Sequence, residues 1–412
     1  AAMDAVPGSV DADEVGAFEG EEGVGPHGAW VVRRRSWVVE RGGRPGQCIG
    51  GRARDAQFAP RTTHRSPATA LVIVRSAHGL YLPAADLHLD ARDAPGTVFV
   101  SHAHADHCSR AARILCTPAT AALHDARRGA REAVTLAFGE TRRVGDADVT
   151  LVPAGHALGS AMLVAEGAEG RAAYTGDYKL RFNPFSPPVE IPRVDTLVME
   201  CTFGEPRYRF PPDAELWARL FAFVDETRAA GAVPVVLAYA LGKGQEALWH
   251  LTRAGYDVVL HGAIANLCAL HERLGHAFPG PGTWSRYAKG QVAGADGAPR
   301  VLLTTPGTRK TAMVQKLPAK RVVHLTGWAL HPGAWNIYKD CDLVLPLSDH
   351  ADFDELVRTA TESGASRVYT THGPPSFAAH LRRLGIDAVH VAEHPNDAGT
   401  DEQTGASADC TD

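Results

Sequence analysis

Residues 97–110 read TVFVSHAHADHCSR, an apolar run that leads directly into a cluster of histidines. Alternate side chains of an extended chain point to the same side, so His102 and His104 can reach one metal ion together. Asp106 and His107 follow immediately and can reach a second position, while the alanines between them let the loop approach the ions closely. The segment therefore predicts a metal-binding loop at the end of a buried strand.

Three further segments place a metal-binding residue type at the end of an expected strand. His156 follows VTLVPAG, Asp177 follows AAYTG, and His372 follows SRVYTT. Each of these residues alone could be an ordinary loop histidine or turn aspartate. With the first cluster they make five histidines and two aspartates, all at strand ends. Nitrogen and oxygen donors without thiolate suit zinc, and also manganese, so we expect a centre for divalent ions.

Composition limits the kinds of protein that the chain can be. No run approaches eighteen apolar residues, which argues against a membrane-spanning helix. The seven cysteines include no CxxC pair, which argues against a disulfide framework or a thiolate zinc knuckle and favours a reduced, cytoplasmic compartment. The formal net charge is −5, so a nucleic acid would have to bind at a local basic groove.

The length of 412 residues predicts two domains. Composition and hydrophobic pattern change along the chain and divide it into segments. Short apolar and β-branched runs in residues 68–206 predict a strand-rich sandwich. Residues 207–334 mix strands with longer amphipathic patterns and predict an inserted α/β domain, and residues 335–394 predict a return to the first domain. The acidic, glycine- and arginine-rich residues 1–67 predict a disordered or poorly packed extension, and residues 395–412 predict a flexible tail.

The order of these motifs resembles that of the metallo-β-lactamase fold. The matching elements are SHAHADH, the Gly-His of PAGHALGSA, the Gly-Asp of YTGDYK and a late histidine. The resemblance implies an αββα sandwich that holds two ions. It assigns the first ion to His102, His104 and His156, the second to Asp106, His107 and His372, and a bridging role to Asp177. Asp90, in DLHLDARDAP, resembles the early aspartate of the fold, which orients the histidine loop.

Further signatures resemble those of the β-CASP nucleases, which carry an α/β domain inserted into this sandwich. VMECTFG places Glu200 at the first signature, LSDHADF places His350 at the second, and VYTTHG places His372 at the third. AYALGKGQEAL resembles a helix start in the inserted domain. Over residues 68–392 the match is closest to the bacterial ligase-associated DNA exonucleases, through GLYLPAADLHLDA, YTGDYKL and ECTFGEPRYRFPP. It implies DNA end trimming in repair, beside an ATP-dependent DNA ligase and a helicase.

The resemblance also suggests how a phosphodiester would be handled. Asp106, as a metal ligand, Glu200 and His350 are the expected catalytic residues. His350 lies outside the expected ligand set and could protonate the leaving oxygen, while Glu200 could hold its imidazole in place. The alternatives are a carboxylate that caps a turn for Glu200 and an ordinary histidine near a helix N-terminus for His350. The GKGQEA segment could present a helix N-terminus, with Lys243 and Gln245, to a substrate phosphate, or it could be a plain turn.

Two other features of the second half have two interpretations each. Trp328 could stack on a nucleobase or pack in the core. A loose basic run could line a nucleic-acid path or form a solvated face, and it consists of Arg309, Lys310, Lys316, Lys320 and Arg321.

The leading hypothesis is therefore a two-metal DNA exonuclease. An RNA-processing nuclease, like RNase J or the pre-mRNA 3′-end endonuclease, would use the same chemistry, because only pocket contacts to the 2′-hydroxyl distinguish the two. The inserted domain and the late SDHAD and THG signatures argue against a small-molecule hydrolase such as a lactonase or thioesterase. A metal-free scaffold subunit is disfavoured because all seven expected ligand positions are filled.

Overall fold

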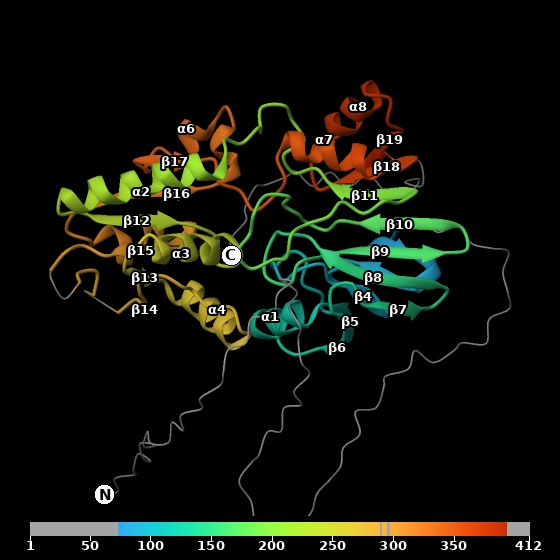
Figure 1. Cartoon of the computed structure of the whole chain (residues 1–412), viewed down its shortest axis with the longest axis horizontal. Helices are drawn as coiled ribbons and strands as arrows, with labels where there is room; N and C mark the ends of the chain where they lie inside the picture. The colour runs from blue at the N-terminus through green and yellow to red at the C-terminus, as the bar shows by residue number, and fades with distance from the viewer. Residues whose placement is uncertain (1–72, 289–290, 295–296, 394–412) are drawn as a thin grey trace, which may run out of the picture. The chain divides into compact units, whose positions relative to one another are not determined.

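The computed structural model describes residues 73–288, 291–294 and 297–393, which belong to one compact unit. The predicted extension over residues 1–67 and the predicted tail over residues 395–412 lie outside the described residues. The described part forms three β-sheets with helices packed against them (Figure 1). None of the helices in this part is both long and apolar enough to cross a membrane.

Two of the sheets come from the part of the chain that is rich in short apolar runs. The first has the order β1-β2-β3-β4-β5-β6, with bounds Val74–Ser76, Gly79–Leu82, Leu87–Leu89, Thr97–Phe99, Arg113–Cys116 and Glu132–Thr135. The second has the order β19-β18-β11-β10-β9-β8-β7, with bounds Ala388–His390, Arg367–Thr371, Thr196–Glu200, Gly170–Tyr174, Ala161–Gly167, Ala147–Pro153 and Thr141–Val144. β3, β4 and β5 are parallel, as are β10, β11 and β18, so the carboxyl ends of each group meet at one edge.

The third sheet is entirely parallel. It has the order β14-β13-β15-β12-β16-β17, with bounds Trp284–Arg286, Val258–Leu260, Val301–Thr304, Val233–Leu237, Lys320–Leu325 and Leu343–Leu345. Strands such as VPVVL are buried along their whole length, as expected for a parallel sheet covered on both faces. Because β17 pairs with β16, this sheet extends beyond residue 334, and the predicted boundary there is too early. The run DLVLPLS predicts a strand, but its composition does not show which sheet the strand joins.

The helices of the described part lie on the outer faces of these sheets. Their bounds are Pro118–Arg128 (α1), Asp213–Ala229 (α2), Lys243–Arg253 (α3), Gly262–Arg273 (α4), Ala312–Gln315 (α5), Ala334–Ile337 (α6), Phe353–Glu362 (α7) and Ser376–Arg383 (α8). α7 and α8 lie over β18 and β11 in Figure 1, whereas α1 packs against the outer side of the first sheet.

Alternate residues of the first two sheets face different cores, as the two-residue period of a strand requires. Phe99 and Leu163 belong to the core between the two sheets. Their neighbours Val98 and Val164 belong to the two outer cores, which the helices cover. The predicted αββα sandwich is therefore confirmed.

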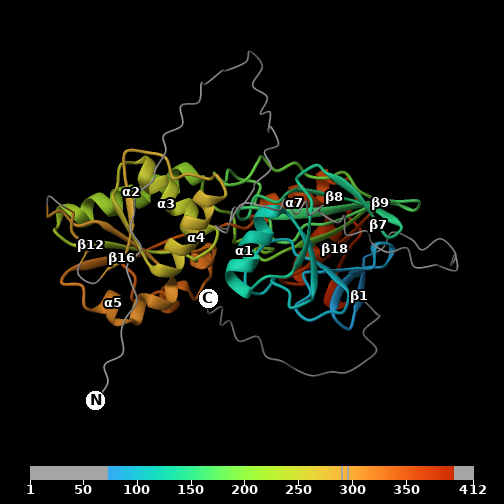
Figure 2. The ribbon, with the colours of Figure 1, turned by 90° about the horizontal axis from the view of Figure 1, so that it is seen from below.

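The third sheet is joined to the sandwich by a shared hydrophobic core. One cluster of buried residues includes Leu123 of α1, Leu158 of the loop after β8, Leu248 of α3 and Ile264 of α4. α1 and α4 accordingly lie side by side in both Figure 1 and Figure 2. The loops at the carboxyl edge of the sandwich are thus held against the helices of the third sheet.

Candidate metal centre

The predicted site residues gather where the parallel strands of the sandwich end. Asp90 follows β3, His102 lies just beyond β4, Asp177 lies just beyond β10, Glu200 ends β11 and His372 follows β18. Ligand sites of sheet proteins commonly lie at the carboxyl ends of strands, because the loops that leave these ends converge. The topology therefore brings together residues that are up to 282 positions apart in the chain, from Asp90 to His372.

Two glycines allow the loops to approach one another closely. Gly155 and Gly176 precede His156 and Asp177, and both have left-handed φ angles, of 77° and 53°. A Cβ atom on Gly176 would lie 2.5 Å from the Cβ of Ser101, and one on Gly155 would lie 2.2 Å from a backbone oxygen. The Gly-His and Gly-Asp motifs thus have a steric reason, since only glycine fits at these two positions.

The structure brings five of the predicted ligands together, namely four histidines and the Asp177 carboxylate. Asp177 Oδ2 lies 3.2 Å from His107 Nε2, 3.6 Å from His102 Nε2 and 3.9 Å from His156 Nε2. His104 joins the cluster through His102 and His156, with ligand atoms within 4.8 Å of one another. These side chains could together bind a divalent metal.

Two of the histidines are oriented through Asp90. His107 Nδ1 lies 2.9 Å from Asp90 Oδ2, which can only accept, so His107 donates there and turns Nε2 toward Asp177. The Ser101 hydroxyl donates to Asp90 at 2.6 Å and therefore accepts from His102 Nδ1 at 2.9 Å. His102 Nε2 is then left as a buried acceptor without a hydrogen-bond partner. An orphaned lone pair of this kind is what a metal ligand offers before its ion binds.

The contact between His104 and His156 fits a cation even more directly. Two backbone carbonyls fix the proton on each ring, because Leu241 O lies 3.1 Å from His104 Nε2 and Asp349 O lies 2.8 Å from His156 Nδ1. The remaining nitrogens, His104 Nδ1 and His156 Nε2, face each other at 2.8 Å. With one proton on each ring, both are acceptors, and a metal ion or a further proton between them would stabilise the pair.

The protonation states of the cluster suit metal binding. Burial, with His107 and His156, holds the pKa of His102 well below its usual range, and burial lowers the pKa of His156 to about 3. Burial alone would raise the pKa of Asp177, but His107 holds it well below its usual range. Burial alone would lower the pKa of His107, but Asp177 and Asp90 hold it well above its usual range, so this ring has to release a proton when an ion binds. The low pKa values of His102, His156 and Asp177 leave the neutral imidazole and ionised carboxylate that coordinate a divalent ion.

Two predicted ligands lie at the rim of the cluster rather than inside it. The Asp106 side chain is 77% exposed, with Oδ2 3.6 Å from His107 Nε2. The His372 side chain is 46% exposed, with Nδ1 4.0 Å from Asp177 Oδ1, and its φ angle of 53° is left-handed. Neither residue belongs to the groups of close ligand atoms among the described residues.

Glu200 and His350 form a buried pair beside the cluster. His350 Nδ1 lies 3.0 and 3.1 Å from the two carboxylate oxygens of Glu200 and donates to them. Glu200 is completely buried, and it also accepts from the Tyr178 amide and the Thr202 hydroxyl. Burial alone would lower the pKa of His350, but Glu200 and Asp177 raise it to about 9. A ring nitrogen of His350 also lies within 4.8 Å of ligand atoms of His156 and Asp177. The sequence-based prediction places His350 outside the ligand set and does not anticipate this proximity.

Several of the site residues line one cavity of about 300 Å³, which we call the metal cavity. Loops of the sandwich supply part of its lining and the third sheet supplies the rest. Its lining includes His104, Asp106, His107, Asp177, Thr202, Phe203, Tyr239, Lys243, Trp328, Ser348, Asp349, His350 and His372. Trp328 is 39% exposed and packs against Phe203 at 4.9 Å, so it is neither a core residue nor a loose surface one.

The two predicted substrate-binding residues differ in their surroundings. Lys243, the first residue of α3, lines the metal cavity, but its ammonium lies 3.0 Å from Asp349, which neutralises its charge. Gln245 is completely buried, and its amide contacts the Gly242 amide, the Ala240 carbonyl and a cysteine sulfur. The polar atoms of Gln245 thus hold the turn before α3, and Gln245 does not line the metal cavity.

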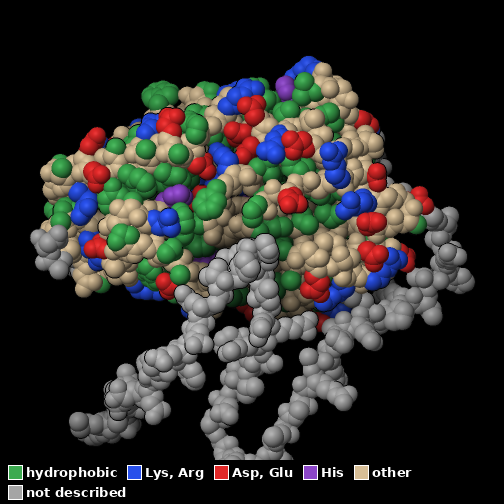
Figure 3. Space-filling view, in the orientation of Figure 1, with side chains coloured by type: hydrophobic (Ala, Val, Ile, Leu, Met, Phe, Trp, Pro, Cys, Tyr) green, Lys and Arg blue, Asp and Glu red, His purple; other side chains and the backbone are tan. Residues whose placement is uncertain are grey.

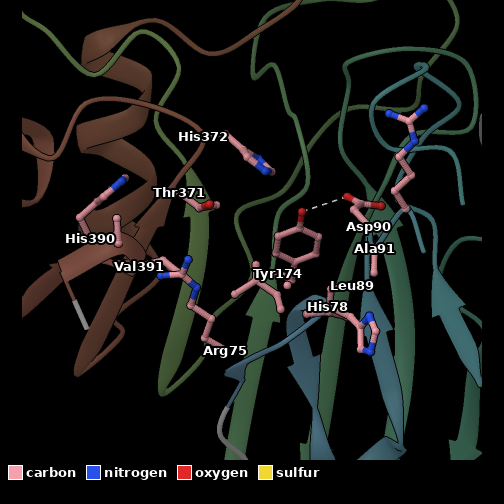
Figure 4. A pocket seen from close by; sticks show the side chains of 14 residues that line it. Arg75, His78, Leu89, Asp90, Ala91, Tyr174, Thr371, His372, His390 and Val391 are labelled. Atoms are coloured by element: carbon pink, nitrogen blue, oxygen red, sulfur yellow. Dashed lines mark hydrogen bonds between the residues drawn. The ribbon is translucent and has the colours of Figure 1, made fainter. Parts of the chain in front are cut away.

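Sequence reasoning also missed residues that shape the site. Asp349 pairs with Lys243 and supplies the carbonyl that orients His156, and only its place in the SDHAD segment hints at this. Tyr174 donates to Asp90 at 2.9 Å, a contact drawn in Figure 4, where His372 projects toward the same space. No pattern in the strand that contains Tyr174 indicates this contact. The basic run from Arg309 to Arg321 contributes no residue to the metal cavity.

Several known proteins are similar in sequence to this chain. No family model matches it. A protein of Opitutus terrae named Probable DNA ligase is 40% identical over 324 residues, which cover 78% of this chain and 31% of that protein. Transcription termination factor FttA of Thermococcus kodakarensis is 34% identical over 154 residues, covering 34% of this chain and 24% of the factor. An RNase J-like protein of Methanocaldococcus jannaschii is 28% identical over 176 residues, covering 37% of this chain and 42% of that protein.

The chain belongs to the β-CASP metallo-β-lactamase family. The resemblance that its motifs carry is thus confirmed. This β-CASP protein spans less than half the length of the three relatives described, so their names belong to proteins with much additional sequence.

Proposed function

We propose that this β-CASP protein is a metal-dependent nuclease that hydrolyses phosphodiester bonds at the ends of DNA during repair. The position of His350, held by Glu200 and lining the metal cavity beside Asp177, is the observation that carries the proposal. A metal cluster alone would suit many hydrolases. An oriented imidazole beside it can also donate a proton to a leaving sugar oxygen, which an unactivated phosphodiester requires.

In this proposal the cluster holds two divalent ions, zinc or manganese. His102, His104 and His156 would hold one ion, His107 would hold the other with Asp106 and His372 from the rim, and Asp177 would be shared between them. The inward-facing nitrogen lone pairs support this assignment. The ions would supply a nucleophile from water and withdraw charge from the phosphodiester.

The protein's own residues position the reactants. Asp90 fixes the ring of His107, and the carbonyls of Leu241 and Asp349 fix those of His104 and His156, so these three rings are already oriented toward the centre of the cluster. Glu200 accepts from His350 Nδ1, so the opposite ring nitrogen is the one that can give a proton to the leaving oxygen.

Two observations support different nucleic acids. The relative named Probable DNA ligase, which matches 78% of this chain, supports a DNA substrate and an association with an ATP-dependent DNA ligase and a helicase. The relatives named FttA and RNase J-like protein support the second candidate, an RNA-processing nuclease. We favour DNA because the ligase-named relative shares far more of this chain.

The test uses one sequence prepared as DNA and as RNA, each single- and double-stranded and labelled at either end. The metal-stripped protein is reloaded with manganese or zinc, and the products are resolved by size over time. We expect DNA to shorten progressively from one end, and His102→Ala to lose both bound metal and activity. His331→Ala is the matched control, because this exposed histidine lies outside the metal cavity. Preferential cleavage of RNA would replace DNA with the second candidate, and equal activity in His102→Ala would refute both.

A further inference from the structure

A second cavity, of about 230 Å³, adjoins the metal-binding loop and is rich in arginine. We call it the arginine cavity, and it is lined by Arg92, Ala105, Cys108, Ser109, Arg110, Arg128 and Arg131. Four of the seven lining residues are arginines and none is acidic. This is unusual for a chain of net charge −5, and on the face shown in Figure 3 basic and acidic side chains are interspersed.

The charges of these arginines are only weakly compensated within the described part of the protein. Arg110 lies 3.4 Å from Asp93, but both side chains are at least 60% exposed, so the pair contributes little. Arg128 donates to the Ala105 carbonyl at 3.4 Å and Arg131 donates to the Ala130 carbonyl at 2.8 Å, and neither pairs with a described carboxylate. The Nε of Arg131 is buried without a partner.

Helix electrostatics explain only part of this cluster. Arg128 ends α1, and a basic side chain there is stabilised by the helix dipole. Arg92, Arg110 and Arg131 come from three loop segments outside that helix, so their convergence has another cause. Guanidinium groups that line one cavity can bind an anion together, and phosphate matches their geometry best.

We infer that the arginine cavity binds a phosphate group of the polynucleotide substrate other than the scissile one. This inference rests on the proposed function. Ala105 lies between His104 and Asp106 in the chain, so a backbone that enters the metal cavity passes close to the arginines. Arg92 also lines the neighbouring cavity of Figure 4, together with Arg75, His78 and Asp90, so one arginine borders both cavities. The arginine cavity thus provides the local basic surface that an acidic protein needs to hold a nucleic acid.

The test measures affinity, at several salt concentrations, of the metal-loaded protein for a fluorescent single-stranded oligonucleotide with cleavage-resistant phosphorothioate linkages. Arg110→Gln and Arg128→Gln are compared with Arg142→Gln and Arg143→Gln, which remove the same charge from β7, outside both cavities. One phosphate contact on a single strand contributes about 0.7 to the salt slope, which corresponds to about fivefold in affinity at 0.1 M salt. We therefore expect each cavity variant to bind about fivefold more weakly with a slope smaller by about 0.7, the double variant about 25-fold more weakly, and the β7 variants as wild type.

A second measurement separates phosphate binding from support of the metal-binding loop. Hydrolysis of bis(p-nitrophenyl) phosphate, which is too small to span both cavities, should be unchanged in the arginine variants. Equal effects in the cavity and β7 variants would overturn the inference, as would parallel losses on the small diester. Binding of inorganic phosphate that the variants abolish, with oligonucleotide affinity unchanged, would also overturn it. If the wild type binds the oligonucleotide but cleaves neither substrate, the proposed function fails, and the arginine variants still decide the inference by affinity.

Discussion

The Glu200–His350 pair gives the sharpest test of the proposed chemistry, because the two residues can be changed separately. Glutamine at position 200 can keep its oxygen at the Oε1 position, where it accepts from the Tyr178 amide and from His350 Nδ1. Its amide nitrogen then faces the Thr202 hydroxyl, which can accept a hydrogen bond. Glu200→Gln therefore removes the charge of the carboxylate and preserves the shape of the site.

The size of the expected effect follows from that difference. A hydrogen bond to a charged group contributes about 1.5–3 kcal/mol and a neutral one about 0.5–1.5 kcal/mol. The loss of about 1–1.5 kcal/mol corresponds to about 5- to 13-fold in kcat on DNA. His350→Ala removes the proposed general acid itself, which is typically worth about 10² to 10⁴ in rate. Since Glu200 acts through His350, the double variant should be no slower than His350→Ala.

The assay follows kcat on ordinary DNA and on a nucleotide p-nitrophenyl ester, whose leaving group needs little protonation. Bound metal and thermal unfolding are measured for each variant, because His350 also lies near His156 and Asp177. The ester should be nearly unaffected by His350→Ala while DNA hydrolysis falls. Equal losses on both substrates, or loss of metal from His350→Ala, would show that His350 positions phosphate or holds an ion and would refute the proton-transfer argument.

Three further predictions concern packing, substrate contact and acid stability. Gly176→Ala should lower the free energy of unfolding in urea titrations by about 1–3 kcal/mol and reduce bound metal, because the alanine Cβ would meet Ser101 and the φ at position 176 is left-handed. An unchanged free energy of unfolding would contradict this. Trp328→Ala should raise KM for single-stranded DNA by about 5- to 150-fold if a base stacks on Trp328. Trp335 is 80% exposed and lies outside the metal cavity, so Trp335→Ala should leave KM unchanged, and equal effects of the two variants would rule stacking out. Burial lowers the pKa of His324 from 6.5 to about 3, so the folded protein favours the neutral ring. The unfolded chain takes up a proton at His324 below pH 6.5, and the folded protein therefore loses stability as the pH falls from 6.5 toward 3. Between pH 7 and pH 5 the wild type should therefore lose about 2 kcal/mol more unfolding free energy than His324→Phe, and equal losses would argue against a buried neutral ring.

The sequence by itself determined the features that depend on local patterns. Short apolar runs separated by turns predicted the sandwich, because the two-residue period of a strand is visible within a few residues. The Gly-His and Gly-Asp motifs located His156 and Asp177, since a left-handed turn that favours glycine after an apolar run is a local feature. The SHAHADH segment indicated a metal-binding loop because its histidines and aspartate lie within a few residues of one another, and the order of the motifs indicated the family.

Only the tertiary structure decided which atoms meet. The ring nitrogens of His104 and His156 are selected by the carbonyls of Leu241 and Asp349, 137 and 193 positions away, and no local pattern reveals such partners. Burial of Gln245 and the addition of β17 to the third sheet are likewise results of long-range packing. The arginine cavity arises in the same way, because arginines from separate segments become neighbours only when the chain folds around the metal-binding loop. Residue types and periodicity are local properties of a chain, whereas the pairing of donors, acceptors and charges depends on contacts that folding creates.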